Sequence, residues 1–172
     1  VSVDTYKSEV ALHVIDHGAA MINDIWGLKA DPEIARVTAE SKIPLVIMHC
    51  QVGREYHNLL SDVMSSLEDG INIALAAGIT MDNIIIDPGI GFGKTLGHNL
   101  ELIAKLDQLK VLNKPILLGV SRKSFIGDIL GLEPAERLEG SLAACVVGVI
   151  NGADILRVHD VGATTRAVRV TQ

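Results

Sequence analysis

The chain has 172 residues, of which 48% are hydrophobic and only 3% are aromatic, so it can build an aliphatic core and is not a disordered protein. This length favours a single domain spanning residues 1–172. The net charge of −6 argues against nucleic acid or a membrane surface as a partner, and no run of residues approaches the ~18 apolar residues of a membrane span.

Six short aliphatic runs predict β-strands. Their apolar residues are continuous rather than alternating, as in strands that are buried on both faces. In chain order they cover residues 1–3, 20–22, 44–48, 84–86, 116–120 and 154–158. Amphipathic or apolar segments between them predict helices over residues 6–17, 31–41, 61–77, 98–112 and 134–150, with a last helix beginning at residue 164.

Three of these helices are followed within two residues by glycine: Gly18, Gly78 and Gly152. Glycine supplies the left-handed residue that commonly ends a helix. A strand follows within a few residues each time, so strands and helices alternate with short connections. This alternation predicts a parallel sheet with right-handed crossovers.

Polar residues follow every predicted strand at its carboxyl end. They are Asp4 and Thr5, Asn23 and Asp24, His49 and Cys50, Asp87, the segment Ser121 to Ser124, and finally Arg157, His159 and Asp160. This arrangement is typical of a (β/α)8 TIM barrel, whose site lies at the C-terminal mouth. A doubly wound open sheet is the alternative, but it usually gathers its ligand groups at one switch point.

The length conflicts with a complete barrel, because eight β/α units usually take ~250 residues. Six strands in 172 residues predict an incomplete barrel of about six units. We therefore expect the first two units and most of the last helix to be absent.

Asp87 opens a glycine-rich segment that ends at Thr95. A carboxylate after a buried aliphatic strand is costly without partners, and two N–H donors on a planar heterocycle would satisfy it. Asp4 and Asn23 end neighbouring strands, so the three side chains could surround such a ligand, with Phe92 as a flat apolar contact. The alternative is that each of them only caps a turn or a helix, and Asp24 is expected to be structural.

Lys123, Arg157 and His159 are the candidate cationic residues. They follow the last two strands, where barrels of this type often bind phosphate. Arg157 and His159 are two residues apart and can point to one face of their strand, which favours a bound anion. The alternative is an ion pair with Asp154 or Asp160, and Arg122 is the residue most expected to form a structural ion pair.

His49 and Cys50 have no further Cys or His at metal-ligand spacing, so we expect no metal there. Cys50 and Cys145 both lie in apolar runs, which favours buried, reduced thiols and a cytoplasmic protein.

Several of these segments together resemble the dihydropteroate synthase family, over the whole chain. They are residues 3–6 (Val-Asp-Thr-Tyr), 22–25 (Ile-Asn-Asp-Ile), 48–49 (Met-His), 86–95 (Ile-Asp-Pro-Gly-Ile-Gly-Phe-Gly-Lys-Thr), 119–127 (Gly-Val-Ser-Arg-Lys-Ser-Phe-Ile-Gly) and 157–161 (Arg-Val-His-Asp-Val). The resemblance implies a pterin-binding TIM barrel and a transferase of folate biosynthesis. That transferase condenses 6-hydroxymethyl-7,8-dihydropterin diphosphate with 4-aminobenzoate, giving 7,8-dihydropteroate and diphosphate, and is a sulfonamide target.

By this resemblance, the pterin pocket is lined by Asp4, Asn23, Asp87 and Lys123. The diphosphate is held by Arg157 and His159, and Phe92 and Ser124 lie near aminobenzoate. The resemblance also implies Mg²⁺ with a ligand loop upstream of Val1, and a homodimer for the full-length protein. The catalytic residues would be Asp4, Lys123, Arg157 and His159, and Cys50 stands where methionine is common.

Two other functions remain open at this point. A pterin-binding methyltransferase shares the Asp, Asn and Asp pattern, although it is not expected to carry the Ser121 to Gly127 segment. A non-catalytic fragment that keeps only the pterin contacts is the alternative from another class.

Overall fold

The computed structural model describes residues 1–171, which divide into two compact units. The first unit contains residues 1–51 and 56–88. The second contains residues 52–55 and the chain from Gly89 onward. Each unit is described by itself below, and the expectation of a single domain stays a prediction.

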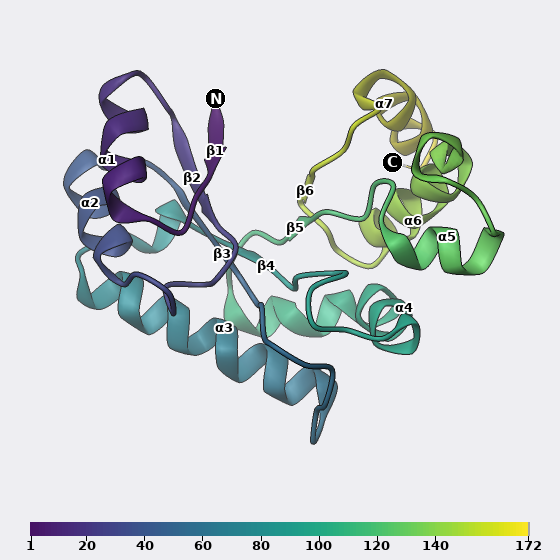
Figure 1. The fold of residues 1–172 in the computed structure, drawn as a ribbon, viewed down its shortest axis with the longest axis horizontal. Coiled ribbons are helices and arrows are strands. Elements are labelled where there is room, and N and C mark those ends of the chain that lie inside the picture. Colours follow the sequence, from purple (N-terminus) through teal and green to yellow (C-terminus); the bar gives the residue numbers. More distant parts are fainter. Residues whose placement is uncertain (172) are drawn as a thin grey trace. The chain divides into compact units, whose positions relative to one another are not determined.

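The first unit alternates strands and helices. Its elements are β1 (Ser2–Asp4), α1 (Ser8–Asp16), β2 (Met21–Asp24), α2 (Glu33–Ser41), β3 (Leu45–Met48), α3 (Leu59–Ala76), the 3-10 turn η1 (Met81–Asn83) and β4 (Ile84–Asp87). The strands form one parallel sheet in the order β1-β2-β3-β4, with α1, α2 and α3 on one side of it (Figure 1).

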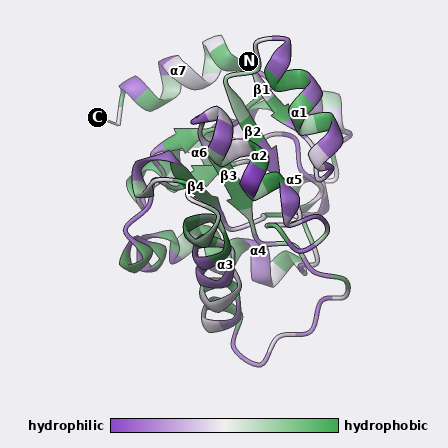
Figure 2. Ribbon diagram, turned by 90° about the vertical axis from the view of Figure 1, so that its left-hand side faces the viewer, coloured by the Kyte–Doolittle hydropathy of each residue, from purple (hydrophilic) through white to green (hydrophobic). Residues whose placement is uncertain are grey.

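Strand β3 is entirely apolar, and its neighbour β4 is apolar up to Asp87. Every residue of β3 and β4 is buried, and the ribbon coloured by hydropathy shows these strands as hydrophobic (Figure 2). The long helix α3 packs on them through Gly70, where an added Cβ would lie 2.6 Å from Cγ2 of Ile47. Glycine at this position therefore lets the helix approach the sheet closely.

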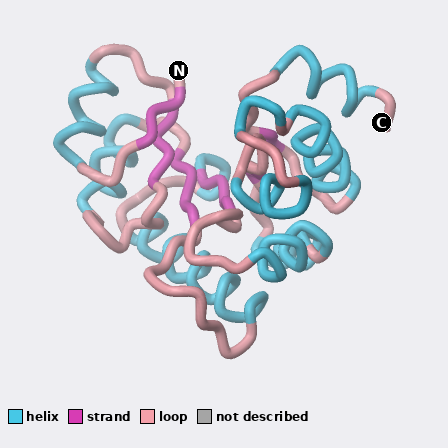
Figure 3. Tube along the Cα trace, turned by 45° about the vertical axis from the view of Figure 1, so that its right-hand side comes forward, coloured by secondary structure: helices cyan, strands magenta, loops and turns pink. Residues whose placement is uncertain are grey.

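The second unit holds the remaining elements, which Figure 3 distinguishes by secondary structure. They are α4 (Leu96–Ala104), the 3-10 helix η2 (Leu106–Leu112), β5 (Leu117–Leu118), α5 (Ser124–Leu130), the 3-10 turn η3 (Pro134–Glu136), α6 (Leu138–Ile150), β6 (Ile155–Leu156) and α7 (Val161–Arg169). The two short strands pair in parallel, with Leu117 opposite Ile155 and Leu118 opposite Leu156.

The structure confirms the predicted fold class. All paired strands are parallel, strands alternate with helices, and the six described strands form a four-stranded and a two-stranded sheet rather than a closed barrel. The predicted helix ends are also confirmed, because Gly18, Gly78 and Gly152 have φ values of +89°, +98° and +103°.

Three predicted helix boundaries are wrong. The single helix expected over residues 98–112 is α4 followed by η2, because Leu106 and Leu109 are both fully buried at a spacing of three, which suits a 3-10 helix as well as an α-helix. The helix expected from residue 134 begins with η3, and only Leu138–Ile150 is α-helical. The last helix begins at Val161 rather than at residue 164.

One helix was not predicted at all. The segment Ser124–Leu130 forms α5, whose seven residues are too few for a clear helical period, and Gly127 lies in its middle. Among the described residues, no helix combines the length and the apolar character that a membrane crossing requires.

Candidate functional site

Asp4 and Asn23 lie side by side at the carboxyl edge of the first unit's sheet. They are register partners, and Nδ2 of Asn23 donates a hydrogen bond of 2.8 Å to Oδ1 of Asp4. Residues paired in a parallel sheet point to the same face, so Val46, the partner of Asn23 on β3, continues this row. The structure thus brings two of the predicted residues into direct contact.

Asp87 faces the same side of the sheet as this row. Its register partner is Met48, which is two residues beyond Val46 on β3 and therefore shares its face. The Asp87 side chain is only 1% exposed, and its backbone carbonyl accepts a hydrogen bond from the amide of His49. A carboxylate, an amide and a second carboxylate are therefore presented on one face at one edge.

Asp24 points to the opposite face, because its register partner Ile47 alternates with Val46. Its carboxylate accepts hydrogen bonds from the amides of Trp26 at 2.9 Å and Leu28 at 2.7 Å. Burial raises the pKa of Asp24, and these two backbone donors partly oppose the rise. Asp24 holds the following turn, as predicted.

Asn23 has an unused acceptor in a buried position. The residue is 2% exposed, and within the described part of the chain its Oδ1 has no hydrogen-bond partner. A buried acceptor without a donor costs about 1–3 kcal/mol. A ligand with an N–H group would satisfy it, so this atom marks a place where such a ligand fits.

In the second unit, the glycine-rich loop after β4 contacts Lys123. The ammonium group of Lys123 donates a hydrogen bond to the carbonyl of Ile90 and lies 4.6 Å from the centre of the Phe92 ring. Gly91 has a φ of +85° and donates its amide to Oδ1 of the buried Asn99 at 2.7 Å. Lys123 and Asn99 thus both hold the loop, and the ammonium group of Lys123 lies beside the Phe92 ring.

The segment after β5 is also fixed by side chains. Arg122 and Asp160 form an ion pair at 2.9 Å, as the sequence predicts for Arg122. Ser124 is exposed and opens helix α5. An added Cβ at Gly127 in this helix would overlap the guanidinium of Arg137, so glycine leaves space for that side chain.

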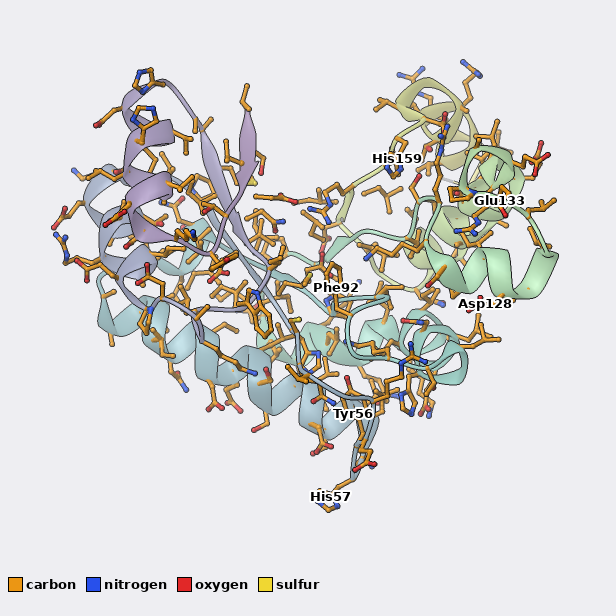
Figure 4. The ribbon with its side chains drawn as sticks, viewed as in Figure 1. Tyr56, His57, Phe92, Asp128, Glu133 and His159 are labelled. Atoms are coloured by element: carbon orange, nitrogen blue, oxygen red, sulfur yellow. The ribbon has the colours of Figure 1, made fainter. Side chains whose placement is uncertain are left out.

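His159 and Arg157 lie at the end of β6, and Figure 4 labels His159 and Phe92 in this unit. The amide of His159 donates to Oγ of Ser121 at 3.3 Å, and its Nδ1 lies 3.0 Å from the same oxygen. Asp160 pairs with Arg122, and Asp154 accepts a hydrogen bond of 2.8 Å from the amide of Ile116. Asp160 thus forms its ion pair with Arg122, and Asp154 holds the start of β5.

The chain as a whole is similar to known proteins. The family model described as pterin binding enzyme matches residues 1–159. The chain belongs to the pterin-binding enzyme family. It is 49% identical over 172 residues to the dihydropteroate synthase of Clostridium beijerinckii, and the match covers 99% of this chain and 64% of that protein.

Solved structures of dihydropteroate synthases superpose closely on this member of the pterin-binding family. The crystal structure from Clostridium difficile in the presence of pteroic acid has a TM-score of 0.97 and 42% identity, over 99% of this chain and 65% of that one. The enzyme from Thermus thermophilus in complex with 4-aminobenzoate has a TM-score of 0.94 and 39% identity, over 99% and 69%. The chain thus spans about two thirds of the length of these relatives.

The described residues do not offer a metal site. No group of three or more His, Cys, Asp or Glu residues among them is placed to hold an ion. His49 is 2% exposed and its ring lies 5.9 Å from that of Tyr56, whose pKa burial raises to about 12, with smaller contributions from Cys50 and Asp62. Mg²⁺ has no such group of ligands among the described residues, and its binding stays a prediction that rests on a loop upstream of Val1.

Four residues that support the candidate site were not predicted. They are the buried Lys94, Asn99 and Ser141 and the partly buried Arg137. Lys94 donates from Nζ to the carbonyl of Phe92 at 3.0 Å, and Ser141 accepts a hydrogen bond from the amide of Arg122. In a single sequence, a polar residue within a helix or loop does not indicate by itself that it supports a site. Asn99 is the exception, because it is a polar residue at a buried position of a helical pattern.

Proposed function

We propose that this chain carries the ligand-binding residues of a dihydropteroate synthase, a transferase of folate biosynthesis. It would join the methylene carbon of 6-hydroxymethyl-7,8-dihydropterin diphosphate to the amine of 4-aminobenzoate. The observation that carries the proposal is the buried Oδ1 of Asn23, without a hydrogen-bond partner in the described structure, beside the Asp4 carboxylate and on the face that also presents Asp87. The family assignment and the similarity to dihydropteroate synthases support it.

The pterin ring offers N–H groups of the kind that carboxylate and amide oxygens accept. Its amino group and ring N–H form a planar edge of donors, which suits the Asp87 carboxylate, and a further N–H suits Oδ1 of Asn23. Lys123 is a compact cation and would donate to a carbonyl of the ligand. Phe92 and Ser124 would lie near the aminobenzoate, Phe92 as an apolar contact and Ser124 as a hydroxyl at the start of α5.

The reaction breaks the bond between the pterin methylene and the diphosphate oxygen and forms a bond to the aminobenzoate nitrogen. The diphosphate leaves with the bonding electron pair, and the cationic groups of Arg157 and His159 would stabilise its growing charge. Positive charge that develops on the methylene would be stabilised by the Asp4 carboxylate. The amine then loses one proton, and an aromatic amine needs no strong protein base to attack.

Asp87→Asn in the complete protein tests the pterin site. An amide replaces one acceptor by a donor that faces the donors of the pterin, and a hydrogen bond to a charged group contributes about 1.5–3 kcal/mol. We expect at least a tenfold loss of kcat/KM for dihydropteroate formation. Asp82→Asn, at an exposed position of η1, is the matched control.

Unchanged kinetics in a folded Asp87→Asn protein would remove Asp87 from the site. If the wild-type protein released no diphosphate with both substrates present, the synthase proposal would be wrong. Mg²⁺ dependence and a homodimer rest on the resemblance alone, and chelation and sedimentation of the complete protein test them. A cytoplasmic location rests on the two reduced cysteines.

A further inference from the structure

Arg122 adopts a backbone conformation that is costly for its residue type. Its φ is +58°, in the left-handed region where an L side chain crowds the following carbonyl. The residue lies between Ser121, which contacts His159, and Lys123, which contacts the loop that bears Phe92. Such a conformation persists only where the surroundings hold it in place.

Contacts with three residues hold Arg122 at this position. Its side chain makes two hydrogen bonds to Asp160, from Nε to Oδ2 at 3.1 Å and from Nη2 to Oδ1 at 2.9 Å. Its amide donates to Oγ of Ser141 at 2.9 Å, and its carbonyl accepts from Nη1 of Arg137 at 3.0 Å. Ser141 in turn donates to the carbonyl of Arg137 at 2.6 Å, so these contacts form one network.

This network links the two chain segments that carry the cationic residues. Asp160 is next to His159 after β6, and Arg122 is next to Lys123 after β5. We propose that Arg122 is a positioning residue: its ion pair with Asp160 holds the left-handed turn that fixes Lys123 and His159 for their ligands. The proposal depends on the proposed function only for the identity of those ligands.

Two substitutions at residue 122 distinguish the effect of the backbone conformation from the effect of losing the side chain. Arg122→Ala and Arg122→Gly both remove the ion pair, but only glycine adopts the left-handed conformation without strain. If the shape of the turn is what matters, the glycine variant keeps roughly five- to thirtyfold more kcat/KM than the alanine variant. This order is the reverse of the usual preference for alanine over glycine in regular structure.

Arg36 in α2 provides the matched control, because it too forms ion pairs, with Glu33 and Glu40, but at an exposed site. Arg36→Ala and Arg36→Gly should leave KM and kcat unchanged, with the glycine variant the less stable of the two. Asp160→Asn breaks the network from its other end. If the side chains of Arg122 and Asp160 act together, adding Asp160→Asn to Arg122→Ala causes little further loss of kcat/KM.

The measurements are kcat and KM for each substrate in the complete protein, and the dissociation constant of inorganic diphosphate by calorimetry. Equal losses in the alanine and glycine variants would overturn the positioning role and indicate that Arg122 contacts a ligand directly. A fall in melting temperature with unchanged KM and diphosphate affinity would reduce Arg122 to a stabilising residue, which also overturns it.

The same data distinguish this inference from the proposed function. If the wild-type protein binds diphosphate and shows the expected order of variants but makes no dihydropteroate, the synthase proposal fails and the positioning role stands. If the wild-type protein makes dihydropteroate but the Arg122→Gly variant is no more active than Arg122→Ala, the synthase proposal stands and the positioning role fails. A wild-type protein that neither binds diphosphate nor turns over contradicts both.

Discussion

The guanidinium of Arg157 lies beside Gly119, which directly follows β5. Its Nε lies 3.6 Å from the position that a Cβ of Gly119 would take, and its Nη2 lies 3.7 Å away. A small side chain at residue 119 would therefore make ordinary van der Waals contact with the guanidinium. The sequence indicated Arg157 by its place after a strand, but its neighbour Gly119 is found only once β5 and β6 are paired.

Arg157→Ala tests the anion site at the level of one residue. Guanidinium groups pair with phosphate oxygens through charged hydrogen bonds, whereas aminobenzoate is assigned to Phe92 and Ser124. We expect the affinity for diphosphate to fall more than the affinity for 4-aminobenzoate, measured by calorimetry on the complete protein. Arg169→Ala, in the exposed last turn of α7, is the control, and equal losses for both ligands would contradict the assignment.

Cys145 should be unreactive in the folded protein. Its side chain is fully buried in α6, and burial raises the pKa of its thiol from 9.0 to about 11. The reactive thiolate is therefore about a hundredfold scarcer at pH 8 than for an ordinary cysteine. Iodoacetamide should modify it only slowly below about pH 11 in a Cys50→Ser background, as followed by mass spectrometry.

Denatured protein is the positive control for this measurement, and rapid native alkylation at pH 8 would contradict the burial of Cys145. Both cysteines were predicted to be buried and reduced, and the structure confirms this. Their position within apolar runs was sufficient for that prediction, because it needs no knowledge of the partners.

Helix α3 depends on the absence of a side chain at Gly70. Glycine in a helix is ordinarily about 1 kcal/mol worse than alanine, so Gly→Ala should stabilise an open helix position. At residue 70 the new Cβ would lie 2.6 Å from Cγ2 of Ile47, within the buried β3 strand. We expect Gly70→Ala to lower the melting temperature.

Gly97→Ala in α4 is the matched control, because its Cβ would meet no atom closer than 3.9 Å. It should raise the melting temperature slightly. If Gly70→Ala and Gly97→Ala shift the melting temperature in the same direction, the contact between residue 70 and Ile47 does not determine the effect of Gly70→Ala. Differential scanning calorimetry measures both.

At the scale of elements, the sequence predicts strands better than helix ends. The continuous apolar runs of β3 and β4 identify buried strands, and glycine marks where three helices end. The division between α4 and η2 could not be predicted, because leucines three apart fit both helix types over such a short distance. Helix α5 was missed because seven residues show too little periodicity.

The positions of the candidate site residues were predictable where a strand end decides them. Asp4, Asn23 and Asp87 follow from the rule that polar residues gather at the carboxyl ends of parallel strands. Asp24 was expected to be structural, and the pairing of β2 with β3 gives the reason, because it turns Asp24 to the other face. Ser141 and Arg137 lie outside the strand ends, and their contacts with Arg122 depend on tertiary folding. No pattern along the sequence predicts these contacts.

For the whole molecule, we expect the 172-residue chain expressed by itself to associate and to form no dihydropteroate. It spans 64% of the length of the Clostridium beijerinckii relative. Its two sheets end in open edge strands, and apolar side chains such as Val161 and Ile150 are 64% and 67% exposed. A coupled assay of diphosphate release on the fractionated monomer tests this.

The Clostridium beijerinckii protein assayed in parallel is the positive control. Turnover by the isolated chain close to that of this relative would show that the six described strands are sufficient for a working site. Sedimentation velocity measures the association, and a single monomeric species would contradict the argument from the open sheet edges.

The overlap between Gly127 and Arg137 has a consequence for how this sequence can change over evolutionary time. The guanidinium of Arg137 occupies the space that a side chain at residue 127 would need, and it also holds the carbonyl of Arg122. A substitution at 127 would therefore select for a smaller residue at 137, and the two positions should vary together among homologous genes. Inherited variation at residues 127 and 137 would in this way alter ligand affinity without replacing any residue that is proposed to touch a ligand.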